Sequence, residues 1–327
     1  MSAQPPTPPP PTGLSAAARA VLARPRGEPV PEPALDDVAG WRRYAELLDA
    51  LTAAALAVRQ PPEAELRATR VEVAGAAAYE LVPAHVTDPG AAPVVVELHG
   101  GAMVSGGGEL AWRASAPTAV RRDAVTWAVD YRMPPEHPFP AALEDCLSVY
   151  REAVARHGAR RVLVSGFSAG GNLAAAVVLR AREEGLSVPA GLVLLSPALD
   201  LTESGDSFRT LRDVAGLAPM PLANRLYAGG RELAHPHLSP LFGDVAGFPP
   251  TFLQSGTRDL FLSNAVRMHR RLLDAGVEVE LRVLEAAGHG GFGGGTPEDE
   301  ALLGDVLAFE ARVLGTGPVG APLRSRA

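Results

Sequence analysis

Residues 162–179 read VLVSGFSAGGNLAAAVVL, and this stretch is the most informative part of the chain. A β-branched apolar run passes directly into an alanine-rich run, which predicts a strand followed by a helix. Ser168 stands at the junction, between Gly166 and Gly170. This G-x-S-x-G pattern predicts a nucleophile elbow, a tight turn that lifts the serine hydroxyl clear of the sheet. The alternative is an ordinary glycine-rich turn, because short motifs also occur by chance.

Composition narrows the classes to which the chain can belong. It has 327 residues, of which 47% are hydrophobic and 20% charged, as is typical of a globular protein. Its formal net charge of −7 disfavours nucleic acid and anionic membrane surfaces as partners. No apolar run approaches the roughly 18 residues that a membrane span requires, so we expect no stable membrane insertion.

The first residues and the single cysteine bear on the compartment. The sequence MSAQPPTPPPPTG, residues 1–13, lacks the basic-then-apolar order of a secretory signal. Cys146 is the only cysteine, which excludes an internal disulfide and favours a reducing compartment. Because Cys146 falls in a predicted helix, we expect a buried core thiol rather than a nucleophile. Together these features predict a cytoplasmic protein.

The chain divides into a tail, a lid and a catalytic domain. Residues 1–13 are proline-rich and predict a disordered tail. Residues 14–68 carry helical patterns that we expect to form N-terminal lid helices. We expect residues 69–327 to form the catalytic domain. It is interrupted at about 201–248 by short pieces rich in glycine, proline and polar residues, which predict a lid insertion.

Predicted strands and helices alternate in the catalytic domain. The strands are expected at 71–75, 78–84, 94–100, 124–131, 161–166, 191–197, 251–256 and 279–286. The helices are expected at 111–122, 141–156, 169–184, 262–275 and 297–314. This order predicts an α/β fold, with a mostly parallel central sheet and helices on both faces. Ligands bind at the carboxyl ends of such strands, where Ser168 would lie. Pairing through an exposed final strand would give a homodimer, a hypothesis that rests on architecture alone.

An elbow serine needs a general base, and His289 is the best candidate among the eight histidines. It alone follows the last predicted strand, in the glycine-rich loop AAGHGGFGGG. In this architecture the base comes last in chain order, and a loop position lets the imidazole reach the serine. The alternative is an exposed loop histidine without a catalytic role.

The base in turn needs an acid that orients it, and Asp259 is the candidate. It follows the strand TFLQSG and lies between Ser168 and His289 in the chain, as the order Ser, Asp, His requires. Its carboxylate would fix the imidazole tautomer and stabilise the imidazolium. A plain helix N-cap is the rival interpretation of Asp259. Asp200, after the strand GLVLLSP, is the second candidate for the acid.

Donors for an oxyanion are expected beside the serine and in the loop after the strand VVVEL. The N–H group of Ala169 follows the elbow serine directly. His99, Gly100, Gly101 and Ala102 form the loop, where small residues let backbone N–H groups approach the oxyanion. His99 precedes Ser168 in the chain, so we expect it to support the loop together with Gly100 rather than act as base.

Several further phrases share one order with a known family. They are the HGG loop, DYRMPPEHPFPAALEDC from Asp130 to Cys146, the elbow GFSAGGNL, SPALDLT, SPLFGDVAGFPP, GTRD and GHGGF. With them the chain resembles a bacterial member of the hormone-sensitive-lipase family of α/β-hydrolases, from about residue 70 to the end. The resemblance implies a carboxylic ester hydrolase with Ser168 as nucleophile, Asp259 as orienting acid and His289 as base. It also implies N–H donors from Gly101, Ala102 and Ala169, and a lid made from N-terminal helices and the segment after the sixth strand.

The chain departs from the family pattern at two positions. Ala102 stands where the family usually has a third glycine, so a methyl group narrows the acyl pocket or limits φ. Phe167 stands before the serine, where the family often has aspartate, and we expect altered packing beneath the nucleophile. Glu136 in the PPEHPF phrase is expected to form a local ion pair involving Asp130 and Arg132.

The function expected is two-step acyl transfer to water, with a small-molecule ester or lactone of short-to-medium acyl length as substrate. This mechanism needs no metal and no organic cofactor. Candidates to line an apolar substrate pocket are Met103, Trp112, Phe167, Phe208, Leu217, Met220 and Leu226, with lid-core packing as the alternative. Two other functions stay open: a non-catalytic or lyase-like small-molecule-binding relative of the same fold, and an amidase or carbamate hydrolase.

Overall fold

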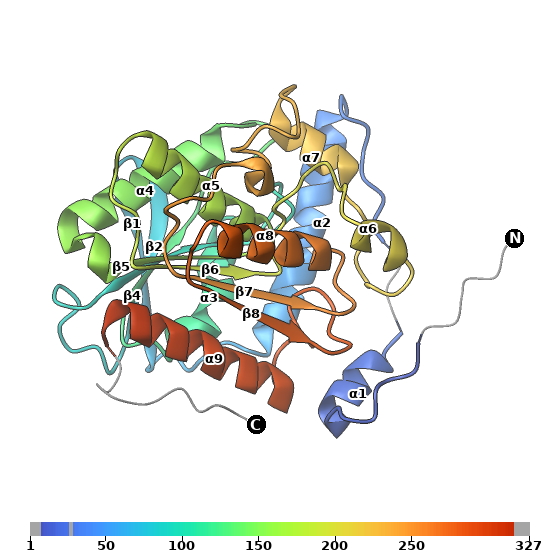
Figure 1. Ribbon diagram of the computed structural model, residues 1–327, viewed down its shortest axis with the longest axis horizontal. Coiled ribbons are helices and arrows are strands. Elements are labelled where there is room, and N and C mark those ends of the chain that lie inside the picture. Colours follow the sequence, from blue (N-terminus) through green and yellow to red (C-terminus); the bar gives the residue numbers. More distant parts are fainter. Residues whose placement is uncertain (1–7, 26–28, 317–327) are drawn as a thin grey trace, which may run out of the picture.

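The computed structural model describes residues 8–25 and 29–316 and contains an eight-stranded sheet (Figure 1). The strands are β1 (Leu66–Val73), β2 (Ala76–Pro83), β3 (Val94–Leu98), β4 (Val125–Val129), β5 (Val162–Phe167), β6 (Gly191–Leu195), β7 (Thr251–Gly256) and β8 (Val279–Leu284). Their spatial order is β1-β2-β4-β3-β5-β6-β7-β8. β2 runs antiparallel to both of its neighbours, and all other neighbouring pairs are parallel. The mostly parallel sheet that was predicted is therefore confirmed.

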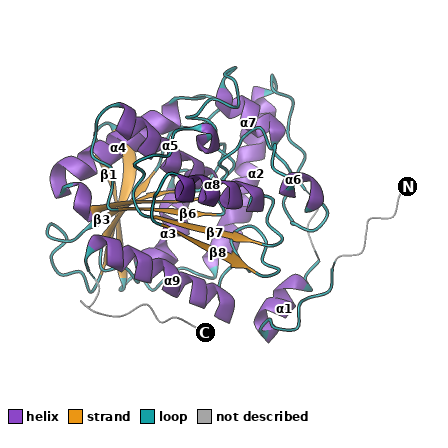
Figure 2. Ribbon diagram, in the orientation of Figure 1, coloured by secondary structure: helices purple, strands orange, loops and turns teal. Residues whose placement is uncertain are grey.

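Helices cover both faces of the sheet (Figure 2). They are α1 (Ala16–Leu22), α2 (Val38–Ala57), α3 (Glu109–Ala119), α4 (Ala141–His157), α5 (Ala169–Glu183), α6 (Ser207–Thr210), α7 (Pro221–Ala228), α8 (Leu262–Asp274) and α9 (Pro297–Leu314), with short 3-10 turns at Ala159–Arg161 and Pro240–Phe242. α4, α5 and α8 lie on one face, and α3 and α9 lie on the other (Figure 1). This arrangement is the three-layer form expected when parallel strands alternate with helices.

The central strands are buried on both faces because both helix layers press on them. Every residue of β3 and β4 is buried, in line with their unbroken apolar runs. Val164 and Leu194 belong to the larger core cluster, whereas Leu163 and Val193 pack with Phe309 of α9. Neighbouring residues of one strand thus face opposite helix layers. Each such aliphatic side chain contributes about 1.5–3 kcal/mol by burial.

The sheet begins earlier than the sequence patterns indicated. β1 starts at Leu66, inside the segment assigned to the lid, and pairs with β2 along its whole length. Leu66 is buried in one cluster with Leu81, whereas Thr69 and Arg70 in the middle of the strand are both exposed, so the strand does not alternate strictly. The hairpin turns at Ala74 and Gly75, which both have positive φ.

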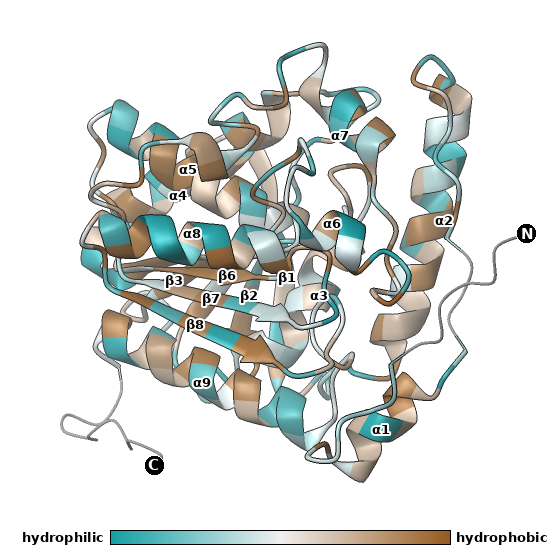
Figure 3. Ribbon diagram, turned by 45° about the vertical axis from the view of Figure 1, so that its right-hand side comes forward, coloured by the Kyte–Doolittle hydropathy of each residue, from teal (hydrophilic) through white to brown (hydrophobic). Residues whose placement is uncertain are grey.

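The two N-terminal helices lie against different parts of the catalytic domain (Figure 3). In α2, Trp41 and Tyr44 pack with Val104 and with α7. Before α1, the N–H and hydroxyl of Ser15 both bond to Glu298 at the start of α9. The two helices of the expected N-terminal lid therefore lie apart, and α2 is the one beside the loop after β3. Residues 1–7 of the predicted tail and residues 317–327 lie outside the described residues.

Two further predictions meet the structure directly. Cys146 is buried within α4, which confirms the expected core thiol. Among the helices of residues 8–25 and 29–316, none combines the length and apolar character needed to cross a bilayer. β8 lies at an edge of the sheet, as the homodimer hypothesis requires, and pairing through it stays a prediction.

Candidate functional site

Ser168 occupies a sharp turn between β5 and α5. Its φ of 56° lies in the left-handed region, a conformation that costs a non-glycine residue on the order of 1–3 kcal/mol. The turn depends on the flanking glycines. A Cβ on Gly166 would lie 2.2 Å from the carbonyl oxygen of Gly170, and a Cβ on Gly170 would lie 1.8 Å from that of Leu98. Only glycine fits at both positions, because the elbow brings two backbone segments into contact.

Asp259 and His289 come together from the loops after β7 and β8. Nδ1 of His289 donates to Oδ1 of Asp259 over 3.1 Å, and the carboxylate is fully buried. Asp259 also accepts from the N–H of Phe261 and the hydroxyl of Ser255, both at 3.1 Å. Burial alone would raise the pKa of Asp259, but the adjacent His289, the N–H of Phe261 and the hydroxyl of Ser196 lower it below its usual value. Asp259 is not the N-cap of α8, which begins after Phe261 without a side-chain cap.

Asp200, the second candidate for the acid, is held by other groups. One of its oxygens accepts from Thr202, and the other accepts from Ser204 at 2.6 Å and Arg267 at 2.9 Å. Although burial acts to raise the pKa of Asp200, these partners lower it. Among the described residues no hydrogen bond joins Asp200 to His289. The geometry therefore pairs the histidine with Asp259.

The His289 ring lies between two phenylalanines. Its centroid is 4.9 Å from the ring of Phe167, the residue before Ser168, and 5.0 Å from the ring of Phe261. The N–H of Gly290 donates to the hydroxyl of Ser196 over 3.0 Å, which fastens the histidine loop to the end of β6. In this form the Ser168 hydroxyl makes no hydrogen bond with the His289 ring within the described part of the chain.

Ser196 and Ser255 are site residues that the sequence analysis missed. Both hydroxyls lie at carboxyl ends of strands, and Ser196 adopts a positive φ of 44°. A serine after an apolar strand is too common to single out. Their contacts with the histidine loop and Asp259 exist only once β6, β7 and β8 are side by side.

The loop after β3 exposes backbone donors beside the elbow. Gly101, Ala102 and Met103 have φ values of 125°, 54° and 64°. A Cβ on Gly101 would lie 2.0 Å from the carbonyl oxygen of Ser105, so this position requires glycine. The N–H groups of Gly101, Ala102 and Ala169 donate to no acceptor among the residues that the structure describes. Ala102 thus adopts the left-handed conformation in spite of its methyl group, at a cost of about 1–2 kcal/mol.

His99 is buried beneath this loop. Its Nδ1 donates to the carbonyl of Gly100 over 2.7 Å, and its ring stacks on Tyr131 with centroids 4.0 Å apart. The Tyr131 hydroxyl donates in turn to the carbonyl of His99. Burial lowers the pKa of His99 to about 4, so its ring is neutral at physiological pH. A Cβ on Gly100 would lie 2.8 Å from the Phe167 ring, which ties this loop to the elbow.

A cavity of only about 10 Å³ adjoins the serine. It is lined by Ala102, Met103, Ser168, Ala169, Ala198, Asp200, Leu201, Glu203, Met220, Asn224 and Phe261. Of the residues expected to form a substrate pocket, Met103 and Met220 lie here. Phe208 packs behind Phe261, with ring centroids 5.4 Å apart. Besides Ser168, three of the lining residues, Asp200, Glu203 and Asn224, are polar, which was not expected of an apolar pocket.

Other expected pocket residues lie elsewhere. Trp112 packs against Tyr79 of β2, with ring centroids 6.5 Å apart, so its assignment to the pocket was wrong. The helix that carries it turns this face toward the antiparallel end of the sheet. Leu226 packs with Trp41 of α2, and Leu217 packs against the main core. Apolar character alone could not separate these packing roles from a cavity.

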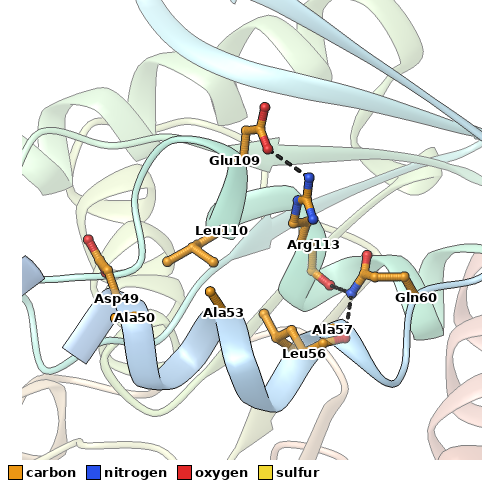
Figure 4. Close-up of a pocket in the computed structure, with 9 residues that line it drawn as sticks. All are labelled: Asp49, Ala50, Ala53, Leu56, Ala57, Gln60, Glu109, Leu110 and Arg113. Carbon is orange, nitrogen blue, oxygen red and sulfur yellow. Dashed lines mark hydrogen bonds and ion pairs between the residues drawn. The ribbon is translucent and has the colours of Figure 1, made fainter. Parts of the chain in front are cut away.

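α2 is fastened to the loop that carries the backbone donors. Asp49 accepts from the N–H of Gly106 over 2.7 Å. Beside this contact a cavity of about 450 Å³ separates α2 from α3; its lining includes Asp49, Leu110 and Arg113 (Figure 4). The expected local ion pair of Glu136 was wrong, because α2 packs beside that loop and supplies Arg42 at 2.8 Å as the partner.

The two other members of the expected ion pair also find different partners. Arg132 binds Asp145 of α4 at 2.7 Å, and Asp130 accepts from the N–H of Gly108. Sequence proximity suggested one local group, whereas the fold distributes these three charges over α2, α4 and the loop before α3.

Comparisons with known proteins agree with this fold. A family model described as the alpha/beta hydrolase fold matches residues 95–292. An esterase of Acinetobacter venetianus is 30% identical over 229 residues, which cover 67% of this chain and 75% of that protein. Esterase LipI of Mycobacterium tuberculosis is 33% identical over 261 residues, 73% of this chain and 80% of that protein. A solved structure of an esterase named E25 has a TM-score of 0.85 at 31% identity, with 95% of this chain and 98% of that chain covered. An esterase described as from the bacterial hormone-sensitive lipase family has a TM-score of 0.78 at 28% identity, with coverage of 92% and 99%.

Proposed function

This chain belongs to the alpha/beta hydrolase family and is an esterase related to hormone-sensitive lipase, and we propose that it cleaves carboxylic esters through Ser168, His289 and Asp259. The observation that carries the proposal is the buried hydrogen bond between Asp259 and His289. The His289 ring also contacts the ring of Phe167, which directly precedes Ser168 on the strained elbow. A serine, a base and an orienting acid from three separate loops are the groups that acyl transfer needs.

The reaction proceeds in two halves. His289 takes the proton of Ser168 as Oγ attacks the ester carbonyl, and the N–H groups of Gly101, Ala102 and Ala169 stabilise the oxyanion. The alcohol leaves with a proton from His289, and water repeats the sequence to release the acid. The lowered pKa of Asp259 keeps its carboxylate ionised at neutral pH, which stabilises the imidazolium.

Formation of the serine–histidine hydrogen bond accompanies substrate binding in this proposal. Catalytic hydrogen bonds are often long before the substrate arrives and shorten in the complex. Glycine has more accessible backbone conformations than other residues, so Gly290 and Gly291 beside the histidine permit a small adjustment of the loop. Its anchors at Asp259 and Ser196 limit that movement to the ring and its neighbours.

A small acyl group fits the site best. The cavity beside Ser168 has room for about one water molecule, and Met103 and Met220 line it. An acetyl-hydrolase of Streptomyces hygroscopicus is among the similar proteins, at 36% identity over 189 residues. We therefore place short acyl esters first as substrates, with lactones and longer chains requiring movement of the methionines.

Hydrolysis of p-nitrophenyl acetate and butyrate tests the proposal. Ser168→Ala should lower kcat by about 10⁴-fold or more, because it removes the nucleophile. Ser187→Ala is the matched control, since Ser187 lies on the surface between α5 and β6. It should keep the wild-type rate. Equal rates for Ser168→Ala and wild type, or no hydrolysis by wild type, would contradict the proposal.

A further inference from the structure

The cavity beside Ser168 contains a carboxylate that the proposed mechanism does not use. Glu203 lines this cavity together with Ser168, Met103 and Met220. It lies in the segment after β6, where its backbone adopts a φ of 53°. That left-handed conformation is costly for a residue with a side chain, so the surrounding contacts must hold it.

One oxygen of Glu203 is engaged and the other is not. Oε1 accepts from the N–H of Met220 over 2.8 Å and from the side chain of Asn224 over 3.1 Å. Oε2 accepts no hydrogen bond from any residue that the structure describes. The contrast is Asp200 in the same cavity, whose two oxygens both accept hydrogen bonds. Glu203 therefore offers a half-buried acceptor to a ligand, and Asp200 does not.

The charges around Glu203 favour a donor or a cation. Burial raises the pKa of Glu203, and the nearby carboxylates of Glu32 and Asp200 raise it further. Glu32 itself accepts hydrogen bonds from the first N–H groups of α7. Arg267 balances Asp200 at 2.9 Å, but no ion pair joins Glu203 to a cation in residues 8–25 and 29–316. A hydroxyl or ammonium group at Oε2 would satisfy this carboxyl group and reduce the repulsion.

The cavity lies on the acyl side of the ester. The leaving alcohol must lie beside His289, which returns its proton, and His289 is not among the residues that line this cavity. Ser168 and the donors of Ala102 and Ala169 do line it. With the movement of Met103 and Met220 that longer acyl chains require, an acyl group whose carbonyl is held by these donors would extend into the cavity toward Glu203.

We propose that Glu203 is a specificity-determining residue that selects short acyl groups carrying a hydroxyl or ammonium group close to the carbonyl. This inference rests on the proposed function, because it assigns a substrate class to the same site. A carboxyl group built to accept a hydrogen bond discriminates strongly against an analogue that lacks the donor, since the acceptor is then left unpaired.

Three ethyl esters of equal shape provide the test: ethyl 3-hydroxybutanoate, ethyl 3-aminobutanoate and ethyl 3-methylbutanoate. The kcat/KM of each ester is divided by the rate constant of its alkaline hydrolysis, which corrects for differences in chemical reactivity between the three esters. At pH 7 the wild type should prefer the hydroxy or the amino ester over the methyl ester by about tenfold or more. A preference for the hydroxy ester identifies a neutral donor, and a preference for the amino ester alone identifies a cation.

Two variants test whether Glu203 causes that preference. Glu203→Leu removes the free acceptor and offers no donor to a substrate hydroxyl, so the ratio should fall close to one. Glu152→Gln, on the outer surface of α4, is the matched control and should keep the wild-type ratio. Because each ratio is measured within one protein, a change of stability does not alter it.

The outcomes separate the two proposals. Cleavage of all three esters at equal normalised rates, or a preference that survives in Glu203→Leu, would overturn the role of Glu203 and leave the esterase mechanism standing. Failure to cleave these esters and p-nitrophenyl acetate would overturn both.

Discussion

Asp259 and Asp200 are two buried aspartates of similar setting with different partners. Only Asp259 contacts His289, so we expect Asp259→Asn to lower kcat about 10⁴-fold by favouring the wrong imidazole tautomer. Asp274→Asn, at the exposed end of α8, is the control and should retain activity. The measurement is p-nitrophenyl acetate hydrolysis, with circular dichroism to confirm folding. Full activity in Asp259→Asn would exclude its orienting role.

His99 predicts a pH dependence of stability. Its pKa is about 4 in the folded protein, against an ordinary value near 6.5, so the unfolded chain binds a proton that the folded chain does not. The contribution of His99 to the free energy of unfolding is therefore fully present above pH 6.5. It decreases by about 3 kcal/mol as the pH drops toward 4. Urea unfolding of wild type and His99→Gln between pH 4 and 8 measures it.

The difference between the two curves is the critical quantity. Below pH 6.5 the free energy of unfolding should decline less steeply in the variant than in the wild type. Above pH 7 the two curves should be parallel. Identical slopes below pH 6.5 would show that His99 does not remain neutral in the folded state.

Individual site residues were predictable to the extent that local motif and chain order define them. Ser168, Asp259 and His289 could be singled out as candidates because each follows a strand in the order that the elbow architecture demands. Ser196 and Glu203 were missed, since their significance comes from hydrogen-bond partners or a cavity supplied by distant segments. Trp112 was misassigned because apolar character does not reveal which face of a helix meets a cavity.

At the level of helices and strands, the elbow depends on close packing of backbone against backbone. Gly170→Ala should destabilise the protein by about 3 kcal/mol, because the added methyl meets the carbonyl of Leu98. Gly304→Ala in α9 is the matched control, since nothing lies within 4 Å of its Cβ position. That change should stabilise by roughly 0.5–1 kcal/mol through helix propensity. Chemical denaturation measures both, and equal effects would contradict the packing argument.

The elements of the catalytic domain were predicted closely, and the N-terminal ones less so. α9 was expected at 297–314 and is found at Pro297–Leu314, because a proline start and a threonine cap mark it locally. β1 begins at Leu66, earlier than expected, since its polar residues carry a weak pattern until pairing with β2 defines it. The position of α1 against α9 depends on Ser15 and Glu298, which are 283 residues apart.

For the molecule as a whole, a buried ion-pair group joins α9 to the centre of the sheet. Arg122 binds Glu97 of β3 and Glu310 of α9, each at 2.8 Å, and its side chain is only 3% exposed. Arg122→Met should destabilise by about 3–5 kcal/mol, because it leaves two carboxylates buried without a counterion. Arg121→Met, whose partner Glu300 lies on the surface, should change stability by less than about 1 kcal/mol. Thermal and urea unfolding of both variants provide the comparison, and equal losses would refute the role of burial.

The α/β architecture, the elbow and the identities of the catalytic candidates follow from amino-acid order alone. Hydrophobic periodicity, glycine at strained positions and polar residues after strands are local properties of the chain. The partner of Arg42, the engagement of Asp200 and the free oxygen of Glu203 were decided by tertiary packing. Hydrogen bonds and burial join residues that are distant in the chain, and no local pattern specifies which of several equivalent polar groups will meet.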